Sequence, residues 1–517
     1  MDTTVMLPAG VSTEQFSKAI AEFRLLLGED NVLATAERVV PYTKLLIPTE
    51  DDASFMPSGA LTPGSVEEVQ KILAICNRYK LPVWPISTGR NWGYGSASPA
   101  TPGQLILDLR KMNKIIEIDV DSCTALLEPG VTYQQLYDHL KENNIPLMLD
   151  VPTIGPMVGP VGNTLDRGVG YTPYGEHFMM QCGMEVVLAN GEILRTGMGS
   201  VPKAKTWQAF KWGYGPYVDG IFTQSNFGVV TKMGLWLMPK PPVIKPFMVR
   251  YQNESDVVKA IDAMRPLRIN QLIPNVVLFM HGHYETAICK TRAEVTSDPG
   301  PISEPDARKV FKELGIGYWN VYFALYGTAE QIAVNEKIVR SIIEPSGGEI
   351  VTEAEAGDNI LFHHHKQLMC GEMTMEEMNI YRWRGAGGGA CWFAPVAQVK
   401  GQEAELQVKL AQRVLAKHNL DYTAGFAIGW RDLHHIIDVL YDRNNAEEKK
   451  RAYACFDELI EVFAAEGFAS YRTNIAFMDK VAKKFGSTNM HVNQQIKKAL
   501  DPNGILAPGK SGIHLPD

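Results

Sequence analysis

Two neighbouring residues near the C-terminus, Tyr471 and Arg472, carry side chains that could together hold a negatively charged oxygen. A tyrosine hydroxyl donates one hydrogen bond, and an arginine guanidinium supplies a permanent positive charge with several donors. The pair leads into the run Thr473 to Phe477, whose pattern predicts a strand. An exposed arginine beside a half-buried tyrosine would show the same two residues, so both interpretations stay open.

A glycine-rich loop runs from Pro85 to Gly95, directly after the short apolar pair Val83 and Trp84. Three glycines and small hydroxyl residues let a backbone approach a ligand closely and direct several N–H groups at one anion. The loop lacks the lysine of the P-loop and the spacing of the dinucleotide-binding fingerprint. A phosphate-binding loop and a tight surface turn would both use these residues.

A second loop, Gly155 to Gly170, is also rich in glycine and carries the small polar residues Asn163 and Thr164. Ahead of the first loop, Ser65 is typical of a helix cap, and apolar residues then recur at helical spacing up to Tyr79. A short strand connects this helix to the first loop. Two such loops in one domain favour a diphosphate ligand over a single phosphate.

Two groups of histidines could also do chemistry. His434 and Asp438 are four residues apart and would share one face of a helix, as a base with its partner or as a structural pair. The three consecutive residues His363 to His365 cannot all converge on one ion in a regular element, and no cysteine or carboxylate is suitably spaced. We therefore predict a polar loop at these histidines and no metal site.

The remaining pattern predicts an α+β protein with two domains. Helices and strands alternate from residue 61 to 128, and Asn190-Gly191 between two apolar runs predicts a hairpin. Prolines near residue 240 mark a boundary, after which the helices become longer and more charged. We expect residues 1–242 and 468–517 to form one discontinuous domain, and residues 243–467 to be inserted in it as a cap.

Composition excludes several classes of function. The chain has 517 residues, more than one hydrophobic core usually serves. A net charge of −8 argues against a nucleic-acid partner. No apolar run reaches the length that spans a bilayer, and no signal peptide is recognisable, so we expect a cytoplasmic protein without membrane contact. Seven scattered cysteines without a Cys-x-x-Cys argue against a disulfide framework.

Four segments, in this order along the chain, resemble the vanillyl-alcohol oxidase family of flavoproteins: the first loop and the runs 162–177, 220–228 and 501–510. Within this family, the sequence is most similar to the flavoprotein subunits that hydroxylate p-cresol and, above all, eugenol. The resemblance implies an FAD-binding domain of the vanillyl-alcohol oxidase type, with an α+β cap domain inserted over the isoalloxazine ring.

The resemblance also implies which residues hold FAD. The expected contacts are Pro85, Ser87, Thr88, Gly89, Arg90, Asn91, Tyr94, Gly162, Asn163, Gly170, Tyr171, Thr172, Glu176, Gly228, Val230, Tyr381 and Lys510. Lys510 stands where family members place a cation at the pyrimidine end of the flavin, although cresol-type members carry arginine there. Tyr381 stands where cresol-type subunits attach FAD covalently. The oxidases use a histidine, and the equivalent residue here is Ala390, so we expect covalent attachment through Tyr381.

The family resemblance implies a role for Tyr471 and Arg472. Matching positions in the family, together with Tyr94, hold the substrate as a phenolate. Hydride loss from the benzylic carbon of the para chain then gives a quinone methide, to which water adds. Three residues, Glu377, His434 and Asp438, remain as candidates for the base that activates this water.

Two departures from the family concern the substrate pocket. Thr153 stands where the oxidases carry an aspartate, and Gly425 stands where the cresol enzymes carry a glutamate. The missing side chain of Gly425 would remove a water-activating base. We expect it also to leave space for a larger para chain or a ring methoxyl group.

These observations predict an FAD-dependent hydroxylase of eugenol or a related 4-alkylphenol. The resemblance implies a c-type cytochrome as electron acceptor and a homodimer of flavoprotein within a heterotetramer. One alternative is an oxygen-consuming oxidase of the same fold, and another is a flavin-carrying electron-transfer subunit that turns nothing over alone. Because bacteria assemble c-type cytochromes outside the cytoplasm, a periplasmic location is the alternative compartment.

Overall fold

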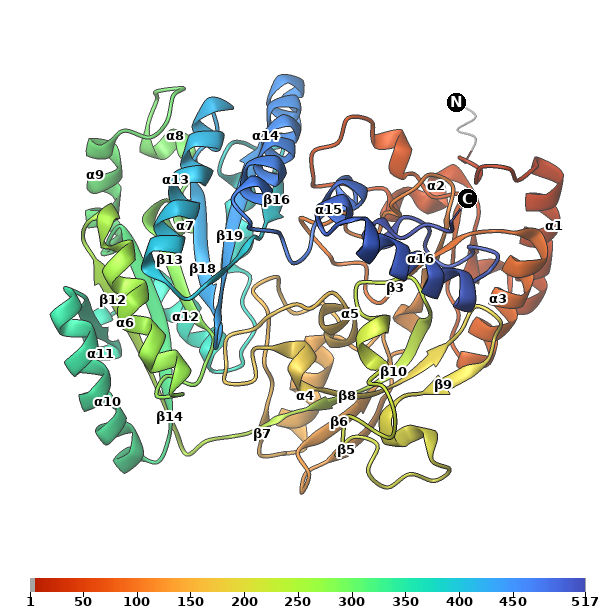
Figure 1. The fold of residues 1–517 in the computed structure, drawn as a ribbon, viewed down its shortest axis with the longest axis horizontal. Coiled ribbons are helices and arrows are strands. Elements are labelled where there is room, and N and C mark those ends of the chain that lie inside the picture. Colours follow the sequence, from red (N-terminus) through yellow and green to blue (C-terminus); the bar gives the residue numbers. More distant parts are fainter. Residues whose placement is uncertain (1–4, 517) are drawn as a thin grey trace.

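The computed structural model describes residues 5–516. Two bodies of secondary structure lie side by side (Figure 1). One contains strands β1 to β11 and the two C-terminal helices, and the other contains strands β12 to β19 with the helices that cover them. Among residues 5–516, no helix has the length and apolar character that a bilayer crossing requires.

The first glycine-rich loop continues from strand β3 (Val83–Ile86) of a small sheet. The strands of this sheet are, in spatial order, β1 (Val32–Leu33), β2 (Gly59–Leu61), β4 (Leu105–Asp108) and β3. Helices α1 (Thr13–Leu27) and α3 (Val66–Tyr79) pack together beside it. The predicted cap at Ser65 is confirmed, because its side chain accepts a hydrogen bond from a backbone N–H in the first turn of α3, and Ser12 caps α1 in the same way.

A second, antiparallel sheet is built from strands on both sides of the second loop in the sequence. Its strands are, in spatial order, β5 (Ile115–Asp119), β6 (Thr124–Leu127), β10 (Val229–Trp236), β8 (Gln181–Val187) and β9 (Ile193–Arg195). The predicted hairpin is confirmed, since β8 and β9 pair across the Asn190-Gly191 turn. Helix α4 (Tyr133–Glu142) precedes the second loop, and α5 (Pro160–Leu165) lies within it and places Gly162 and Asn163 in a helical turn.

The C-terminal segment returns to the first loop. Helices α15 (Met478–Lys484) and α16 (Ser487–Leu500) lie across the N-terminal body (blue in Figure 1). The segment after them runs parallel to β3, with hydrogen bonds from Val83 N to Ile505 O (2.8 Å) and from Ala507 N to Val83 O (2.7 Å). This pairing brings Lys510 beside a loop that is more than 400 residues away in sequence.

The larger sheet occupies the other body. Its path is β15 (Glu349–Thr352), β12 (Val243–Tyr251), β14 (Trp319–Gly327), β13 (Val277–His281), β18 (Thr423–Ile428), β19 (Asp432–Tyr441) and β16 (Gly389–Phe393), with β17 (Val396–Gln398) also on β19. Every pairing in it is antiparallel. These strands alternate with long helices, as the composition of this part of the chain predicted.

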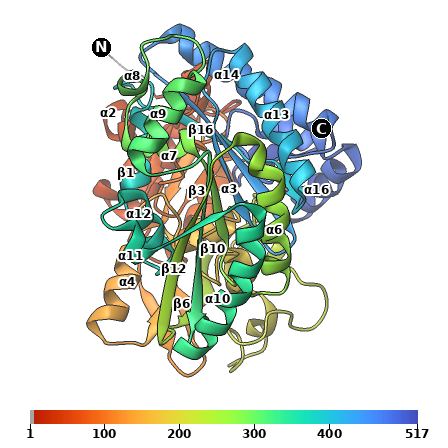
Figure 2. The ribbon, with the colours of Figure 1, turned by 90° about the vertical axis from the view of Figure 1, so that its left-hand side faces the viewer.

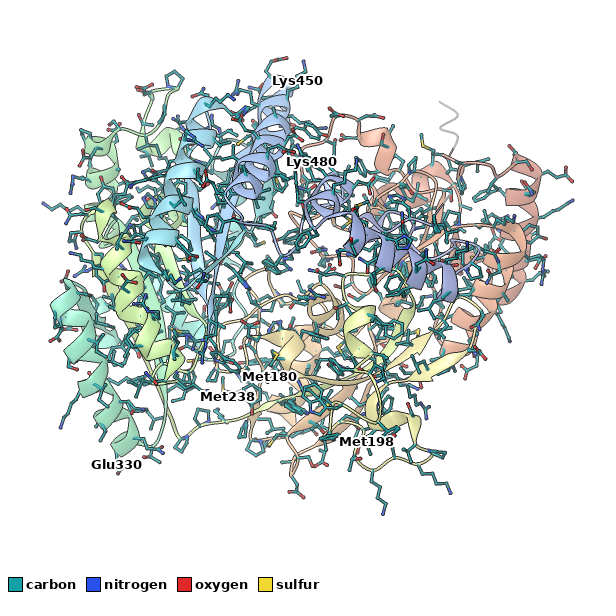
Figure 3. All side chains as sticks on the ribbon, viewed as in Figure 1. Met180, Met198, Met238, Glu330, Lys450 and Lys480 are labelled. Atoms are coloured by element: carbon teal, nitrogen blue, oxygen red, sulfur yellow. The ribbon has the colours of Figure 1, made fainter. Side chains whose placement is uncertain are left out.

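Helices cover this sheet, and Figure 2 views the molecule from this side. The packed helices are α6 (Val257–Ile269), α7 (Gly282–Cys289), α10 (Ala329–Ile343), α12 (Ile360–Met369), α13 (Gly401–Lys417) and α14 (Ala446–Ala465). Helix α9 (Glu304–Leu314) packs on α7. The chain enters this body through Met238, labelled in Figure 3, in the short strand β11 (Met238–Pro239), which pairs with β7 (Leu147–Met148).

Three local predictions are wrong. His434 and Asp438 lie in strand β19 and not in a helix, because this run is rich in isoleucine and valine and pairs with strands on both sides. His363 to His365 lie in helix α12 and not in a polar loop, with the last two fully buried. The run from Thr473 to Phe477 forms no strand, and Ser470 ahead of it makes only a single bridge to Pro395.

Lys497 anchors α16 from the protein interior. Its ammonium donates to Asp501 Oδ2 (2.7 Å) and to the carbonyl oxygens of Asn226 (2.9 Å) and Leu506 (2.6 Å). Both members of the ion pair are almost completely buried. The lysine therefore connects the helix to the segment that carries Lys510.

Replacing Lys497 by alanine should destabilise the protein by about 3–5 kcal/mol, because Asp501 would remain buried without its counter-ion. Denaturant unfolding of the protein measures the change. Lys498→Ala, at the exposed neighbouring residue, is the control and should stay within about 0.5 kcal/mol of the native protein. Equal unfolding midpoints for the two variants would contradict this role.

Candidate active site

The first glycine-rich loop forms one wall of a cavity between the two small sheets and the C-terminal segment. Twelve of the predicted cofactor residues line it: Pro85, Ser87, Thr88, Gly89, Arg90, Asn91, Tyr94, Gly162, Asn163, Gly228, Val230 and Lys510. Both loops that were predicted to hold a diphosphate therefore meet at one cavity. The hypothesis of a tight surface turn is wrong, because this loop faces inward.

Two glycines allow the close approach of the loops. A side chain on Gly162 would collide with Ser87, which lies in the opposite loop. Gly93 has a φ of +74°, and a side chain there would collide with the ring of Trp392. Glycine at these positions therefore keeps the two loops together and brings Tyr94 against the large sheet.

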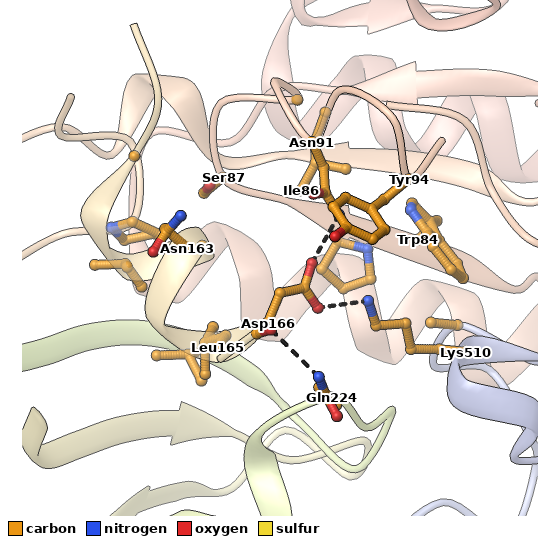
Figure 4. A pocket seen from close by; sticks show the side chains of 18 of the residues that line it. Trp84, Ile86, Ser87, Asn91, Tyr94, Asn163, Leu165, Asp166, Gln224 and Lys510 are labelled. Atoms are coloured by element: carbon orange, nitrogen blue, oxygen red, sulfur yellow. Dashed lines mark hydrogen bonds and ion pairs between the residues drawn. The ribbon is translucent and has the colours of Figure 1, made fainter. Parts of the chain in front are cut away.

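Figure 4 shows the polar side chains at one end of this cavity. Asp166 accepts hydrogen bonds from Lys510 Nζ (2.8 Å) and from Asn91 Nδ2 (2.8 Å), one on each carboxylate oxygen. Gln224 Nε2 donates to the carbonyl oxygens of Asp166 (3.2 Å) and Tyr471 (3.0 Å). Asp166 thus joins both loops to the C-terminal cation, a role that the sequence did not assign.

The cavity suits FAD by the chemistry of its lining. Backbone and small hydroxyl side chains form the part that two phosphates would need, and Lys510 supplies a cation at the other end. Ser225 Oγ and Asn226 Oδ1 are buried at the cavity wall without a hydrogen-bond partner in residues 5–516. These unpaired atoms leave polar groups available to a ligand.

A second, smaller cavity of about 70 Å³ adjoins the first at Tyr94 and Arg472, which line both. The guanidinium carbon of Arg472 lies 4.2 Å from the ring centre of Tyr94 and 5.4 Å from that of Tyr471. The Tyr471 hydroxyl is buried and has no partner among the described residues. The arrangement offers two phenolic donors and one cation to an incoming anion.

The protonation states of these groups suit that role. Burial raises the pKa of the Tyr94 hydroxyl and of the Tyr471 hydroxyl, although the charge of Arg472 opposes both shifts. Both tyrosines therefore remain protonated hydrogen-bond donors at neutral pH. Burial alone would lower the pKa of Arg472, but the neighbouring tyrosines and Asp166 outweigh it and raise the pKa, so the guanidinium stays charged.

Of the three candidate bases, only Glu377 lines the smaller cavity. It lies in the short helix η10 (Glu376–Arg382) and is 7% exposed. The Tyr284 hydroxyl donates to its Oε1, and His364 Nε2 lies 3.5 Å from its Oε2. Burial would raise the pKa of Glu377, yet the hydrogen bonds and charge of these neighbours outweigh burial and lower it.

The other two candidates lie outside the lining of this cavity. Asp438 is fully buried, and neither carboxylate oxygen has a hydrogen-bond partner among residues 5–516. Burial, followed by the charge of Glu377, raises its pKa far above the usual range. His434 stacks on the ring of Tyr471 at 4.5 Å and pairs with Asp432 at 2.9 Å, not with Asp438. The predicted His434–Asp438 pair is therefore wrong.

Five predicted cofactor residues do not line the larger cavity: Gly170, Tyr171, Thr172, Glu176 and Tyr381. Tyr171 lines the smaller cavity beside Thr153, and Thr172 donates through its backbone N–H to Asp150 (2.7 Å). Tyr381 meets the rings of Trp92 and Trp392 edge-on, at 6.5 and 6.2 Å. Its hydroxyl is buried with no partner in the part of the chain that the structure describes.

The expected space at Gly425 does not exist. Gly425 lies in β18 opposite Met280 of β13, and a side chain built on it would meet the Met280 sulfur at 2.5 Å. Met280 itself lines the smaller cavity. Because its thioether fills the position, Gly425 shapes the pocket through Met280 and does not border the cavity itself.

The sequence also missed residues that the fold brings to the site. Tyr284 and Trp392 line the smaller cavity, and His364 lies behind Glu377. The histidine run was the one signal for His364, and it was assigned to a loop. No group of three or more possible metal ligands occurs among residues 5–516.

Comparison with known proteins identifies the family. Residues 57–197 match the FAD binding domain family, and residues 255–511 match the C-terminal domain of FAD linked oxidases. The sequence is 54% identical over 512 residues to the 4-cresol dehydrogenase [hydroxylating] flavoprotein subunit of Pseudomonas putida, covering 99% of this chain and 98% of that protein. The chain belongs to the p-cresol methylhydroxylase family of FAD flavoproteins.

Solved structures agree with this assignment. The crystal structure of p-cresol methylhydroxylase with substrate bound superimposes with a TM-score of 0.97 at 54% identity, covering 99% of both chains. The 4-ethylphenol oxidase from Gulosibacter chungangensis, in complex with isoeugenol, gives 0.95 at 37% identity, covering 98% of this chain and 99% of that one. The predicted family and its α+β, two-domain FAD-binding fold are confirmed.

Replacing Gly162 by alanine should lower the FAD content of the purified protein several-fold, because the new methyl group displaces Ser87 from the cavity wall. Such overpacking costs about 1–3 kcal/mol. The ratio of flavin to protein absorbance measures the loss. Gly220→Ala is the matched control, because a side chain there would meet nothing within 4 Å, and it should retain full flavin content.

Proposed function

We propose that the protein is an FAD-dependent hydroxylase of 4-alkylphenols of the eugenol type. The observation that supports this most strongly is the position of Tyr94 and Arg472 on the wall between the two cavities. A phenolic oxygen bound by these residues and Tyr471 would hold a substrate ring in the smaller cavity, next to the cofactor cavity.

In this proposal, a phenolate clamp binds the substrate as its anion. The clamp consists of Tyr94, Tyr471 and Arg472. The positive charge of Arg472 lowers the pKa of the bound phenol, and a tenfold preference for the anion corresponds to about 1.4 kcal/mol. The phenolate oxygen donates electron density to the para carbon, which makes the benzylic hydrogen a better hydride. Bound FAD supplies the acceptor for that hydride. The neutral quinone methide that remains is open to attack by water.

We propose Glu377 as the base that takes a proton from this water. It lines the smaller cavity, and its lowered pKa keeps it ionised at neutral pH. The raised pKa of Asp438 keeps that carboxyl group protonated. Environments that separate the pKa values of two nearby carboxyl groups often assign one of them as base.

Tyr381 is proposed as the covalent attachment point of FAD. Its hydroxyl is buried without a partner between two tryptophan rings, and Ala390 lies in β16 with no group that could form the bond. We further propose that residues 1–242 and 468–517 form the FAD-binding domain and that residues 243–467 form the cap. In support, β12 to β19 all fall within the proposed cap.

We propose a c-type cytochrome subunit as the electron acceptor, with two copies of the flavoprotein in a heterotetramer. The support is that the Pseudomonas putida relative is itself described as a flavoprotein subunit. Mass determination of the complex from its native host tests the stoichiometry. Fractionation of the same cells decides between the cytoplasm and the periplasm.

A second candidate, an oxygen-using 4-alkylphenol oxidase, is favoured by the likeness to the 4-ethylphenol oxidase. The departure at Thr153, where the family oxidases carry an aspartate, argues for the hydroxylase. A steady-state assay with eugenol, using either oxygen or an added cytochrome as acceptor, separates the two. Hydrogen peroxide formed at the rate of substrate loss would establish the oxidase. Absence of flavin reduction by any 4-alkylphenol would instead indicate an electron-transfer subunit.

Tyr471→Phe should slow flavin reduction in an anaerobic single turnover, and Arg472→Ala should slow it more because a charge is lost as well. Losing one hydrogen bond to a charged group costs about 1.5–3 kcal/mol, or roughly one to two decades in rate. Stopped-flow absorbance at 4-alkylphenol saturation measures both. Unchanged reduction in both folded, flavin-loaded variants would remove these residues from the site.

Native protein should keep its yellow colour in the pellet after acid denaturation, whereas Tyr381→Phe should release FAD into the supernatant. The reason is that phenylalanine keeps the packing between the tryptophan rings but lacks the oxygen that forms the bond. Flavin fluorescence of the two fractions is the measurement. A colourless pellet from native protein would contradict covalent attachment through Tyr381 but not the binding of FAD.

A further inference from the structure

Glu377, the proposed base, lies in a buried cluster with four other polar side chains that have no role in the proposed reaction. Adjacent residues Tyr284 and Glu285 come from α7, and adjacent residues His364 and His365 come from α12. All four are at most 2% exposed. Tyr284 and Glu377 reach the smaller cavity, and the other three do not line it.

The two histidines serve different carboxylates. His365 Nε2 lies 3.0 Å from Glu285 Oε1, and both of these side chains are completely buried. His364 Nε2 lies 3.5 Å from Glu377 Oε2, and the Tyr284 hydroxyl donates to Glu377 Oε1. The Tyr284 hydroxyl thus bonds one oxygen of Glu377, and His364 Nε2, which completes no hydrogen bond among residues 5–516, faces the other. Only one of the two histidines approaches the proposed base.

The ring of His364 is held from its other side. His364 Nδ1 lies 3.3 Å from Thr374 Oγ1, which accepts the backbone N–H of Glu376 at 3.2 Å. A threonine hydroxyl that accepts this bond can donate its own proton to Nδ1. In that orientation Nδ1 accepts a hydrogen bond, so the ring proton of His364 is on Nε2, which faces Glu377. The hydrogen bond at one ring nitrogen of a histidine commonly sets the tautomer in this way.

We propose that His364 is a positioning residue for water addition, which with Tyr284 holds Glu377 ionised and fixed at the cavity wall. The proposal rests on the proposed function of Glu377. When water adds, its oxygen bonds to the benzylic carbon of the quinone methide, and one O–H bond breaks. The electron pair of the exocyclic double bond returns to the ring oxygen as phenolate beside Arg472, and the proton passes to Glu377.

The charge of Glu377 depends on a small set of neighbours. Its titratable neighbours are His364 from α12, which approaches its carboxylate, His365 from the same helix, which pairs with Glu285, Tyr284 from α7, Tyr171 from the loops, Tyr381 from η10 and Asp438 from β19, and Thr153 adds a hydroxyl group. Among them, His364 opposes the effect of burial most strongly. Without it, burial would raise the pKa of Glu377, so the base would be protonated and inactive up to a higher pH.

The test measures the pH profile of hydroxylated product formation and, in parallel, single-turnover flavin reduction. In His364→Leu, the acid limb of the pH profile of product formation should move to higher pH by at least about one unit. Flavin reduction at saturating substrate should stay within about twofold, because the phenolate clamp is intact. His364→Gln restores a hydrogen-bond donor, so its acid limb should lie close to that of the native protein.

His365→Leu is the matched control, because it removes the neighbouring, equally buried histidine that pairs with Glu285. It should leave the acid limb in place. If His364→Leu does not fold, Tyr284→Phe removes the other donor and should move the limb in the same direction. The proposal is overturned by an unmoved limb in folded His364→Leu or Tyr284→Phe, or by an equal displacement in His365→Leu. Failure of native protein to reduce its flavin would overturn the proposed function instead.

Discussion

The cation of Arg472 imposes the main constraint on this site. Its guanidinium lies against the face of Tyr94, and no carboxylate among residues 5–516 forms an ion pair with it. A buried charge without a counter-ion is costly, and an anionic ligand removes that cost. A phenolate suits the site because the two tyrosines add donors but no negative charge. The arrangement therefore selects a ligand that can become an anion at one edge of an aromatic ring.

The fold assembles this site from distant parts of the chain. Tyr94 comes from the first loop, Arg472 from the segment between α14 and α15, and Lys510 from the segment that pairs with β3. Glu377 reaches the smaller cavity, which Tyr94 and Arg472 also line, from the body that contains β12 to β19. In our proposal, the loop body thus supplies the anion-binding groups at Tyr94, and the body of β12 to β19 supplies the base.

Much of this could be predicted from the sequence because local chemistry decides it. Capping serines set the starts of α1 and α3, and Asn190-Gly191 sets the hairpin, since each acts within a few residues. The glycine loop was recognisable for the same reason. Its ligand was not, because a turn and a phosphate loop have the same local requirements.

The wrong predictions concern positions where tertiary context decides. His434 and Asp438 share a face in a helix or in a strand, but in a strand they lie about 13 Å apart. The burial of His364 depends on Glu377 and Thr374, which no spacing rule connects to it. The space expected at Gly425 is filled by Met280 from a neighbouring strand, and strand order cannot be read from a single run of residues.

The central claim, that the site binds its substrate as a phenolate, can be tested by ultraviolet difference spectroscopy with 4-bromophenol. This ring has no benzylic carbon, so it binds without turnover. We expect the spectrum of the phenolate for the bound ligand well below the pH at which the free phenol ionises, and its loss in Arg472→Ala. A bound spectrum of the neutral phenol across the same pH range would contradict the account.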